Sequence, residues 1–314
     1  MAKKEKDYNA IKARRIDSRP FSEIGAYTVL LRSKKKKRVN RSKAGDITLF
    51  VFLAIAGSFS MLPLLLTFFN AFKPLNELFL YPPRLWVANP TLVNFIDLAN
   101  ALGNSLVPFS RYFFNTILVT FAGTLGHIII ASMCAYPLAK YKIPGGSLIM
   151  GIIVYSLMFP GSVTAIPHYL IFNVLGMIDT QWSLILPSIA SSLGLFLMRQ
   201  FMTQVPTDYI ESAKLDGAGD MKILWKIVMP IVKPAWLTLL ILLFQSLWAA
   251  SGAQYIYRED LKMVSYAITQ IATAGPARQG TLAAVSLIMI LVPISVFVIT
   301  QSQVMETMAH SGMK

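Results

Sequence analysis

A polar stretch in the second half of the chain reads Val205-Pro206-Thr207-Asp208-Tyr209-Ile210-Glu211-Ser212-Ala213-Lys214-Leu215-Asp216-Gly217-Ala218, and Ile227-Val228-Met229-Pro230 follows it. The pattern predicts a short helix, a break at glycine and a second helix. Asp208, with Glu211 three residues later, fits a capping box at the start of the first helix. Asp216-Gly217 is a turn signal, because glycine adopts a positive φ without steric cost. We therefore expect an ordered, amphipathic connection that can dock on a partner protein.

Six apolar stretches without charged side chains surround this connection, four before it and two after it. The whole chain of 314 residues is 55% hydrophobic and 14% charged, with a mean hydropathy of +0.56. A helix of about 20 apolar residues crosses the ~30 Å hydrocarbon layer of a membrane. The sequence therefore predicts an all-α polytopic membrane protein with six transmembrane helices. The stretches are Ile47–Phe69, Phe113–Ala139, Leu148–Phe172, Trp182–Met198, Ala235–Ala250 and Thr281–Gln301.

Basic residues are concentrated on one side of these stretches. Residues 1–46 hold fifteen Lys or Arg against five Asp or Glu, which accounts for most of the net charge of +14. Lys140 and Lys142 follow the second stretch, and further Lys and Arg follow the fourth. Because cytoplasmic loops carry the excess of Lys and Arg, both termini are expected in the cytoplasm. The expected parts are a basic cytoplasmic segment 1–46, a permease domain 47–305 with a cytoplasmic connection 205–230 and extracellular loops 70–112 and 251–280, and a cytoplasmic tail 306–314.

The basic segment also bears on the partners of the chain. A Lys or Arg close to an anionic leaflet gains about 1 kcal/mol, so contact with membrane lipid is expected. Nucleic-acid binding is the competing interpretation, and no aromatic interleaving or known module supports it.

The polar connection resembles the cytoplasmic EAA signature of binding-protein-dependent ABC importers. That signature is Glu-Ala-Ala, three residues, Gly, nine residues, Ile, one residue and Leu-Pro. This chain has Glu211-Ser212-Ala213, Gly217, Ile227 and Met229-Pro230, so it departs from the signature at Ser212 and Met229. Phrases such as Ala135-Tyr136-Pro137-Leu138-Ala139 look like the maltose-type carbohydrate permeases. The C-terminal residues from Gln303 are similar to the branch that imports complex oligosaccharides.

The resemblance implies a type I ABC importer permease fold in the bacterial cytoplasmic membrane. It also implies a second homologous permease, two copies of a cytoplasmic ATP-binding subunit, an extracellular solute-binding protein and an oligosaccharide substrate. ATP and Mg would be bound by the partner subunits, and no cofactor is expected on this chain, which has no Walker-type phosphate loop. The residues expected to couple to the ATPase are Asp208, Glu211, Ser212, Ala213, Leu215, Asp216, Gly217 and Pro230.

Candidate residues of the substrate path lie mostly around the fifth stretch. Sugar sites combine aromatic faces with a few converging hydrogen-bonding groups. The loop that follows the stretch reads Gln254-Tyr255-Ile256-Tyr257, which indicates an ordered loop, and the resemblance implies that it reaches into the docked binding protein. An interfacial belt of Trp and Tyr is the competing interpretation. The candidates are Asn115, Gln245, Trp248, Gln254, Tyr255 and Tyr257.

Other function classes receive less support. His127 and His168 have no Cys or carboxylate at ligand spacing, and Cys134 is the single cysteine, so no metal site is expected. No nucleophile-elbow sequence occurs, so no catalytic residue is proposed. An ion-coupled carrier usually needs an ionisable group within a span, and the six stretches contain no Asp, Glu, Lys or Arg. Ion-coupled transport, a membrane enzyme or scaffold, and ABC import of a non-sugar solute remain the alternatives.

Overall fold

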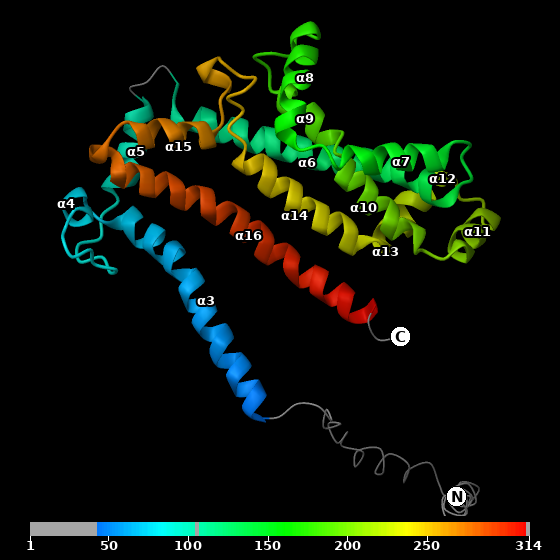
Figure 1. Cartoon of the computed structure of the whole chain (residues 1–314), viewed down its shortest axis with the longest axis horizontal. Helices are drawn as coiled ribbons and strands as arrows, with labels where there is room; N and C mark the ends of the chain where they lie inside the picture. Colours follow the sequence, from blue (N-terminus) through cyan, green and yellow to red (C-terminus); the bar gives the residue numbers. More distant parts are fainter. Residues whose placement is uncertain (1–42, 104–106, 312–314) are drawn as a thin grey trace, which may run out of the picture. The chain divides into compact units, whose positions relative to one another are not determined.

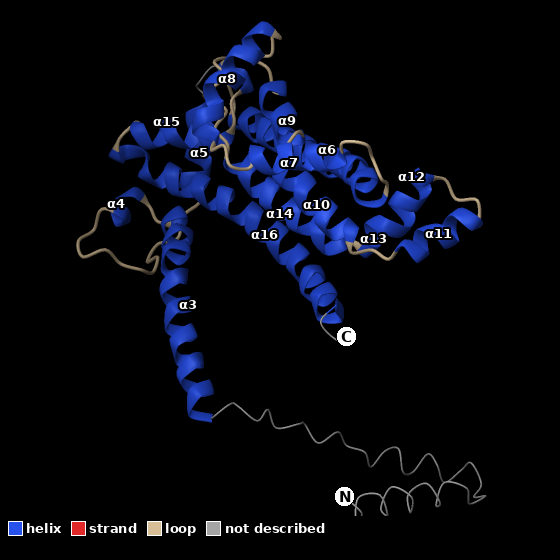
Figure 2. Ribbon diagram, turned by 45° about the vertical axis from the view of Figure 1, so that its right-hand side comes forward, coloured by secondary structure: helices blue, strands red, loops and turns tan. Residues whose placement is uncertain are grey.

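In the computed structural model, residues 43–103 and 107–311 are described, and within them every regular element is a helix (Figures 1 and 2). The predicted basic segment 1–46 therefore lies almost wholly outside the described residues, as does the end of the predicted tail. The longer helices are α3 (Lys43–Phe72), α5 (Val93–Gly103), α6 (Phe109–Lys140), α7 (Gly146–Ser156), α8 (Gly161–Val174), α9 (Trp182–Ile189), α10 (Ser192–Thr203), α11 (Thr207–Leu215), α14 (Lys233–Ala249), α15 (Val264–Thr273) and α16 (Gln279–Ser311). Short elements between them are α4 (Leu75–Leu78), α12 (Asp220–Ile223), the π-helical turn Leu224–Val228, α13 (Met229–Ile231) and the 3-10 turns Glu259–Leu261 and Pro276–Arg278.

Within the described residues, four helical segments are long and apolar enough to cross a membrane: Ala44–Phe72, Phe109–Lys140, Trp182–Thr203 and Pro276–Ser302. Two bent pairs, α7 with α8 and Asp220–Ile231 with α14, raise the number to six when each pair is counted as one span. All six predicted stretches are thus helical over most of their length. The last of them continues as helix to Ser311, so the predicted boundary at residue 305 lies inside α16.

The third predicted span is a broken helix. α7 ends at Ser156, α8 begins at Gly161, and the two axes meet at 107°. Pro160 is the N-cap of α8 with an extended backbone (φ −68°, ψ 149°). A proline has no N–H to continue the preceding helix and disfavours a helical conformation of the residue before it, so the chain turns here.

Helix α6 is the central element of the packing. It contacts α9, α10 and α14, while α14 also packs along α16 (Figure 1). Its C-terminal half contributes Ile128, Ala131, Ala135 and Tyr136 to the largest buried cluster, called the inner cluster below, which also contains residues of α10 to α14. Its N-terminal end joins a second cluster with α5, α15 and α16. One helix therefore links the two clusters.

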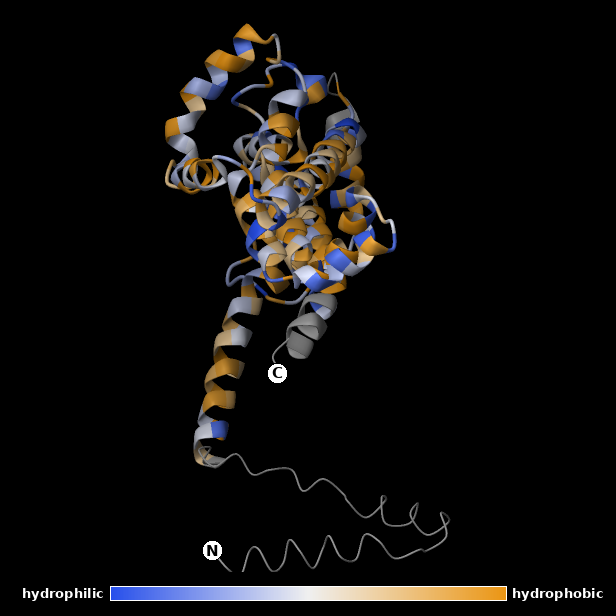
Figure 3. Cartoon of the chain, turned by 90° about the vertical axis from the view of Figure 1, so that its right-hand side faces the viewer, coloured by the Kyte–Doolittle hydropathy of each residue, from blue (hydrophilic) through white to orange (hydrophobic). Residues whose placement is uncertain are grey.

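Helix α3 is apolar along most of its length, as Figure 3 shows. The chain divides into two compact units, residues 1–60 and 61–314, and the boundary falls within this helix. Every described side chain from Ala44 to Leu66 is exposed. Such a continuous exposed apolar surface is typical of a helix surrounded by lipid or by a partner helix.

Both long connections that were predicted to be extracellular contain helices. The predicted loop 70–112 includes α4 and α5, and the predicted loop 251–280 includes α15. α5 and α15 each pack against α16, and their buried residues Leu98, Val264, Ala267 and Ile271 explain why these segments are folded.

Candidate functional site

The polar connection forms the predicted helix, glycine break and second helix. α11 runs from Thr207 to Leu215, and a second helical segment begins at Asp220. The predicted capping box is wrong, because Pro206 occupies the N-cap position and no side chain caps the helix. Asp208 lies two positions after the N-cap, inside the first turn, so it cannot act as N-cap. As an acidic residue of the first turn, it instead complements the helix dipole.

The glycine break is a Schellman motif. Gly217 has φ +77°, its N–H donates to the carbonyl of Lys214 at 3.0 Å, and the N–H of Ala218 donates to the carbonyl of Ala213 at 2.9 Å. These two hydrogen bonds close the end of α11 and satisfy its free carbonyls. The predicted turn at Asp216-Gly217 is confirmed in its geometry.

α11 has one buried face and one exposed face. Ile210 and Ala213 are buried in the inner cluster. On the opposite face, Asp208, Glu211 and Leu215 follow one another at helical spacing together with Ser212. Leu215 is 89% exposed, which is a high exposure for an apolar side chain, and carboxylates lie on the same face. We call the surface formed by Asp208, Glu211, Ser212 and Leu215 the exposed stripe of α11. Of the other predicted coupling residues, Asp216, Gly217 and Pro230 are also exposed, whereas Ala213 is buried.

Three residues that the sequence did not single out fix this region to α6. The hydroxyl of Tyr141, the C-cap residue of α6, donates to Asp220 at 2.5 Å and accepts from Lys214 at 2.8 Å. Lys214 and Asp220 also form an ion pair at 3.4 Å. The hydrogen bond to the Tyr141 hydroxyl, together with Asp220, raises the pKa of Lys214. The start of the second helical segment and the end of α11 are thereby tied to the C-terminal end of α6.

The outer loop after α14 is ordered, as predicted. The Asp179 carboxylate accepts hydrogen bonds from the backbone N–H groups of Tyr257 and Arg258, at 2.5 and 2.9 Å. The amide of Asn115 donates to the carbonyls of Asp260 and Lys262, at 2.8 and 3.1 Å. The loop is therefore held from two sides, by α6 and by the connection between α8 and α9.

An ion pair between the buried Lys262 and the half-buried Glu259 lies at the base of this loop. Lys262 donates to Glu259 at 2.8 Å, and the hydroxyl of Tyr112 donates to the same carboxylate at 2.5 Å. Burial alone would raise the pKa of Glu259, but the hydrogen bonds from Lys262 and Tyr112 outweigh it and keep this pKa below its usual value. Glu259 is thus a structural carboxylate of the loop.

The predicted substrate-path residues do not form one site. Asn115 is buried and its amide group is engaged by the loop and by Gln181, which donates to it at 2.9 Å. Trp248 is buried against Phe244, with its indole N–H donating to the carbonyl of Met289. Tyr255 is half-buried with its ring edge to Phe172. Gln245, Gln254 and Tyr257 are exposed, the last two on the outer loop.

A cavity rich in hydroxyl groups is lined in part by α14, the helix that carries Gln245 and Trp248. Its volume is about 620 Å³, and it occupies the breaks between α7 and α8 and between α9 and α10. We call it the hydroxyl cavity. A signal for it exists in the sequence, because serines gather around Pro160 and Pro187 in two proline-interrupted spans. The lining residues are Ser156, Leu157, Phe159, Thr164, His168, Leu184, Pro187, Ser188, Ala190, Ser191, Ser192, Leu193, Leu243, Ser246 and Leu247.

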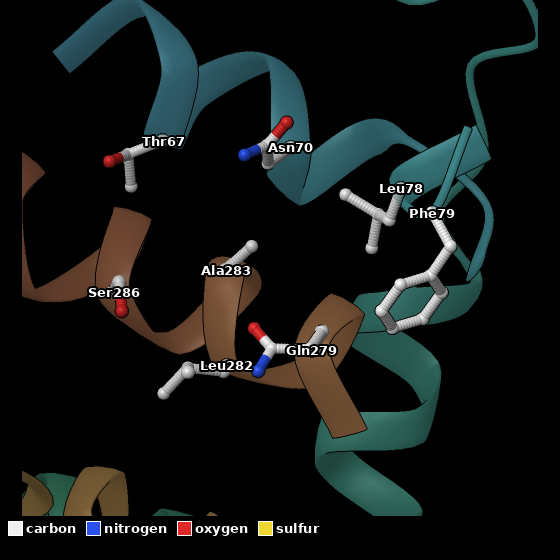
Figure 4. Close-up of a pocket in the computed structure, with 8 residues that line it drawn as sticks. All are labelled: Thr67, Asn70, Leu78, Phe79, Gln279, Leu282, Ala283 and Ser286. Carbon is white, nitrogen blue, oxygen red and sulfur yellow. The ribbon is translucent and has the colours of Figure 1, made fainter. Parts of the chain in front are cut away.

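A second polar cavity of about 310 Å³ lies between the end of α3, α4 and the start of α16 (Figure 4). Asn70 and Gln279 extend toward it from opposite sides, and Phe79 lies at one end. Among the described residues, no group of three or more His, Cys, Asp or Glu side chains is placed to hold a metal ion.

Comparison with known proteins identifies one family. Residues 127–306, more than half of the chain, match the family described as "Binding-protein-dependent transport system inner membrane component". Protein LplC of Bacillus subtilis (strain 168) is 28% identical over 299 residues, covering 88% of this chain and 98% of LplC. The sn-glycerol-3-phosphate transport system permease protein UgpE of Yersinia enterocolitica is 29% identical over 252 residues, covering 79% of this chain and 90% of UgpE.

A solved structure shares the fold. One chain of a bacterial ABC transporter involved in the import of the acidic polysaccharide alginate superposes with a TM-score of 0.71 at 22% identity. The match covers 83% of the present chain and 98% of that chain. The arrangement described above is therefore the fold of a type I importer permease.

Proposed function

Because the chain belongs to the inner membrane components of binding-protein-dependent transport systems, we propose that it is a permease subunit of an ATP-driven importer of oligosaccharides. The exposed stripe of α11 is the observation that carries the coupling part of this proposal. A short helix that is anchored by Ile210 and Ala213 and closed by Gly217 presents carboxylates and Leu215 outward. A rigid, amphipathic surface of this kind suits a cleft on an ATP-binding subunit.

The other subunits of the importer are inferred from the surfaces that this chain leaves exposed. The apolar surfaces of α3, α7 and α8 suit a second, homologous permease and the surrounding lipid. Two copies of a cytoplasmic subunit would bind ATP and Mg and hydrolyse the nucleotide. An extracellular protein would deliver the solute to the outer loop. In this arrangement both termini and α11 lie on the cytoplasmic side.

Saccharide is the solute class that the hydroxyl cavity favours. One related transporter takes sn-glycerol-3-phosphate and another the acidic polysaccharide alginate, and both solutes carry hydroxyl groups. A phosphate would need a cation or a dedicated anion site. The hydroxyl cavity is lined by seven hydroxyl or imidazole side chains and by no Lys or Arg, which favours a saccharide over a phosphate ester.

The test is reconstitution with the partner subunits. The chain is co-expressed with candidate permease and ATPase subunits from the same genome, and ATP hydrolysis is measured with and without the binding protein loaded with oligosaccharides. We expect loaded binding protein to stimulate hydrolysis and to drive uptake into vesicles. Absence of a copurifying ATPase, or uptake that stops on collapse of an ion gradient alone, would support ion-coupled transport instead.

Replacing residues 253–258 by a Gly/Ser linker is expected to lower uptake and the stimulation by loaded binding protein. These residues contain the exposed Gln254 and Tyr257, and the linker removes the ordered surface that Asp179 holds through two backbone hydrogen bonds. Assembly and basal ATP hydrolysis should stay unchanged, because the inner cluster is untouched. The measurements are ATPase activity and uptake of radiolabelled oligosaccharide in the reconstituted complex.

The matched control is a Gly/Ser replacement of Val87 to Asn89 in the other long outer connection. Full stimulation in the 253–258 variant would show that the loop neither docks the binding protein nor displaces its solute.

A further inference from the structure

The helical segment before α14 lies across the axis of that helix. Asp220–Ile231 leads through the single residue Val232 into α14, and the two axes meet at 81° (Figure 1). α14 has 17 residues and is therefore about 26 Å long. This length nearly covers the ~30 Å hydrocarbon layer, so α14 can cross the membrane without the preceding segment. With α14 as the span, Asp220–Ile231 runs along the membrane surface where the span begins. We call Asp220–Ile231 the elbow segment.

One face of the elbow segment is buried in the protein. Ile223, Leu224 and Val228 are almost completely buried and belong to the inner cluster. Asp220, the first residue of the segment, forms an ion pair with Lys214 of α11 at 3.4 Å. These contacts fix the rotation of the segment about its own axis, so they determine which side chains point away from the protein.

The opposite face carries apolar and basic side chains in two neighbouring rows. Met221 and Trp225, four residues apart, are 55% and 40% exposed. Lys222 and Lys226, also four residues apart, are exposed beside them. Residues with this spacing are neighbours on a helix surface. The exposed face is therefore apolar along one row and basic along the next, a pattern typical of helices that lie in the membrane interface.

The charge of the elbow segment complements an anionic surface. Residues 220–233 contain the basic residues Lys222, Lys226 and Lys233 and a single carboxylate, Asp220, which is paired with Lys214. Neither Lys222 nor Lys226 forms an ion pair with another described residue. A lysine near an anionic leaflet strengthens binding by about fivefold, the equivalent of about 1 kcal/mol. A tryptophan ring favours the level of the lipid headgroups. Charge and residue type thus indicate the same partner.

We propose that the exposed face of the elbow segment binds anionic phospholipids of the leaflet in which α14 begins. Met221 and Trp225 enter the headgroup layer, and Lys222 and Lys226 pair with lipid phosphate groups. Because Asp220 is bonded to the end of α11, lipid binding also holds α11 at a fixed height relative to the membrane. That this leaflet is the cytoplasmic one rests on the proposed function, whereas the lipid contact itself does not.

A fluorescent label on the elbow segment provides the test. Met221→Cys is introduced together with Cys134→Ser, which removes the single native cysteine, and the new thiol is labelled with the fluorophore NBD. The chain is purified with its partner subunits and reconstituted in nanodiscs of phosphatidylcholine and phosphatidylglycerol in equal amounts. One of the two phospholipids carries a quenching doxyl group, either near the headgroup or near the end of the acyl chain. The matched control is the same label at Leu215→Cys, an exposed apolar position on the neighbouring α11.

We expect the label at position 221 to be quenched most by the doxyl group near the headgroup. Phosphatidylglycerol carrying this group should quench about fivefold more strongly than phosphatidylcholine carrying it, because the lysines enrich the anionic lipid. Lys222→Gln together with Lys226→Gln should remove this preference, whereas Lys222→Arg together with Lys226→Arg should retain it. The label at position 215 should not be quenched by either lipid.

Four results would overturn the proposal: no quenching at position 221, strongest quenching by the deep doxyl group, equal quenching by the two phospholipids, or equal quenching at positions 215 and 221. An unquenched label whose emission changes when the ATPase subunit is added would assign the face to that subunit instead. Stimulation of ATP hydrolysis by loaded binding protein is recorded separately in the wild-type complex. Lack of stimulation refutes the proposed importer, whereas stimulation with an unquenched label at position 221 refutes only the lipid-binding face.

Discussion

Replacing Gly194 with alanine is expected to destabilise the protein strongly, although alanine is the better helix former. Gly194 lies in the first turn of α10, and a Cβ atom there would be 1.7 Å from Nε2 of His127 and 2.6 Å from its Cε1. His127 is completely buried, and its Nδ1 is 2.8 Å from the carbonyl oxygen of Ile189. The ring therefore has no room to move away. Overpacking of a core costs about 1–3 kcal/mol and occasionally more, and this overlap should reach the upper end.

The measurement is the recovery of monodisperse protein and its Tm in detergent. The matched control is Gly151→Ala in α7, where a Cβ would meet nothing within 4 Å. There the change should be neutral or stabilising by about 0.5–1 kcal/mol, from helix propensity alone. Adding His127→Ala to Gly194→Ala should restore part of the lost stability, because the second substitution removes the ring that the first one strikes. A Gly194→Ala protein as stable as the wild type would contradict the close packing of α6 on α10.

This contact illustrates what the sequence alone could predict. No metal partner for His127 lies at ligand spacing in the sequence, but the sequence does not show what the ring packs against. Its actual partner, Gly194, is 67 residues away and carries no side chain, so no pattern in the sequence marks it. The apolar stretches and the turn at Gly217 were predictable because hydropathy and glycine act locally.

The substrate path was less predictable for a related reason. Trp248 and Asn115 were singled out as residue types that bind sugars, but both are buried and occupied by partners from other helices. Residue type does not reveal which face of a helix is buried in the monomer. The hydroxyl cavity depends on the bend of 107° at Pro160, and a proline in a membrane helix can cause anything from a slight kink to a complete break.

Helix α6 connects the two regions proposed to be functional, the outer loop and α11. Its outer end holds the outer loop through Tyr112 and Asn115, and its C-cap residue Tyr141 holds Lys214 and Asp220. A helix of 32 residues spans about 48 Å. Movement imposed on α11 can therefore reach the outer loop through one continuous helix. A substitution that impairs α11 should therefore affect the outer loop as well as the ATPase interface.

Glu211→Lys is expected to leave the protein in the membrane and to abolish the link between ATP hydrolysis and uptake. Glu211 is exposed at the centre of the exposed stripe of α11, so its replacement does not disturb Ile210 or Ala213 beneath it. Juxtaposing like charges at an interface costs several kcal/mol, and each 1.4 kcal/mol is a factor of about ten. Stimulation by loaded binding protein and uptake should both fall by more than about tenfold. The matched control is Asp97→Lys, a charge reversal at an exposed position of α5 on the outer side.

Gly217→Val tests the same joint through the backbone. A φ of +77° costs an L-residue roughly 1–2 kcal/mol, and a β-branched side chain resists it most. A Cβ at Gly217 would meet nothing within 4 Å, so any effect comes from the conformation and not from a clash. Gly217→Asn, which tolerates a positive φ, should retain most of the activity, whereas Gly217→Val should uncouple as Glu211→Lys does. ATPase activity and uptake are compared in complexes whose subunit composition is checked first. This check distinguishes dissociation of the ATPase subunit from loss of coupling in the intact complex. Normal uptake by both Glu211→Lys and Gly217→Val would show that α11 does not transmit the ATPase cycle.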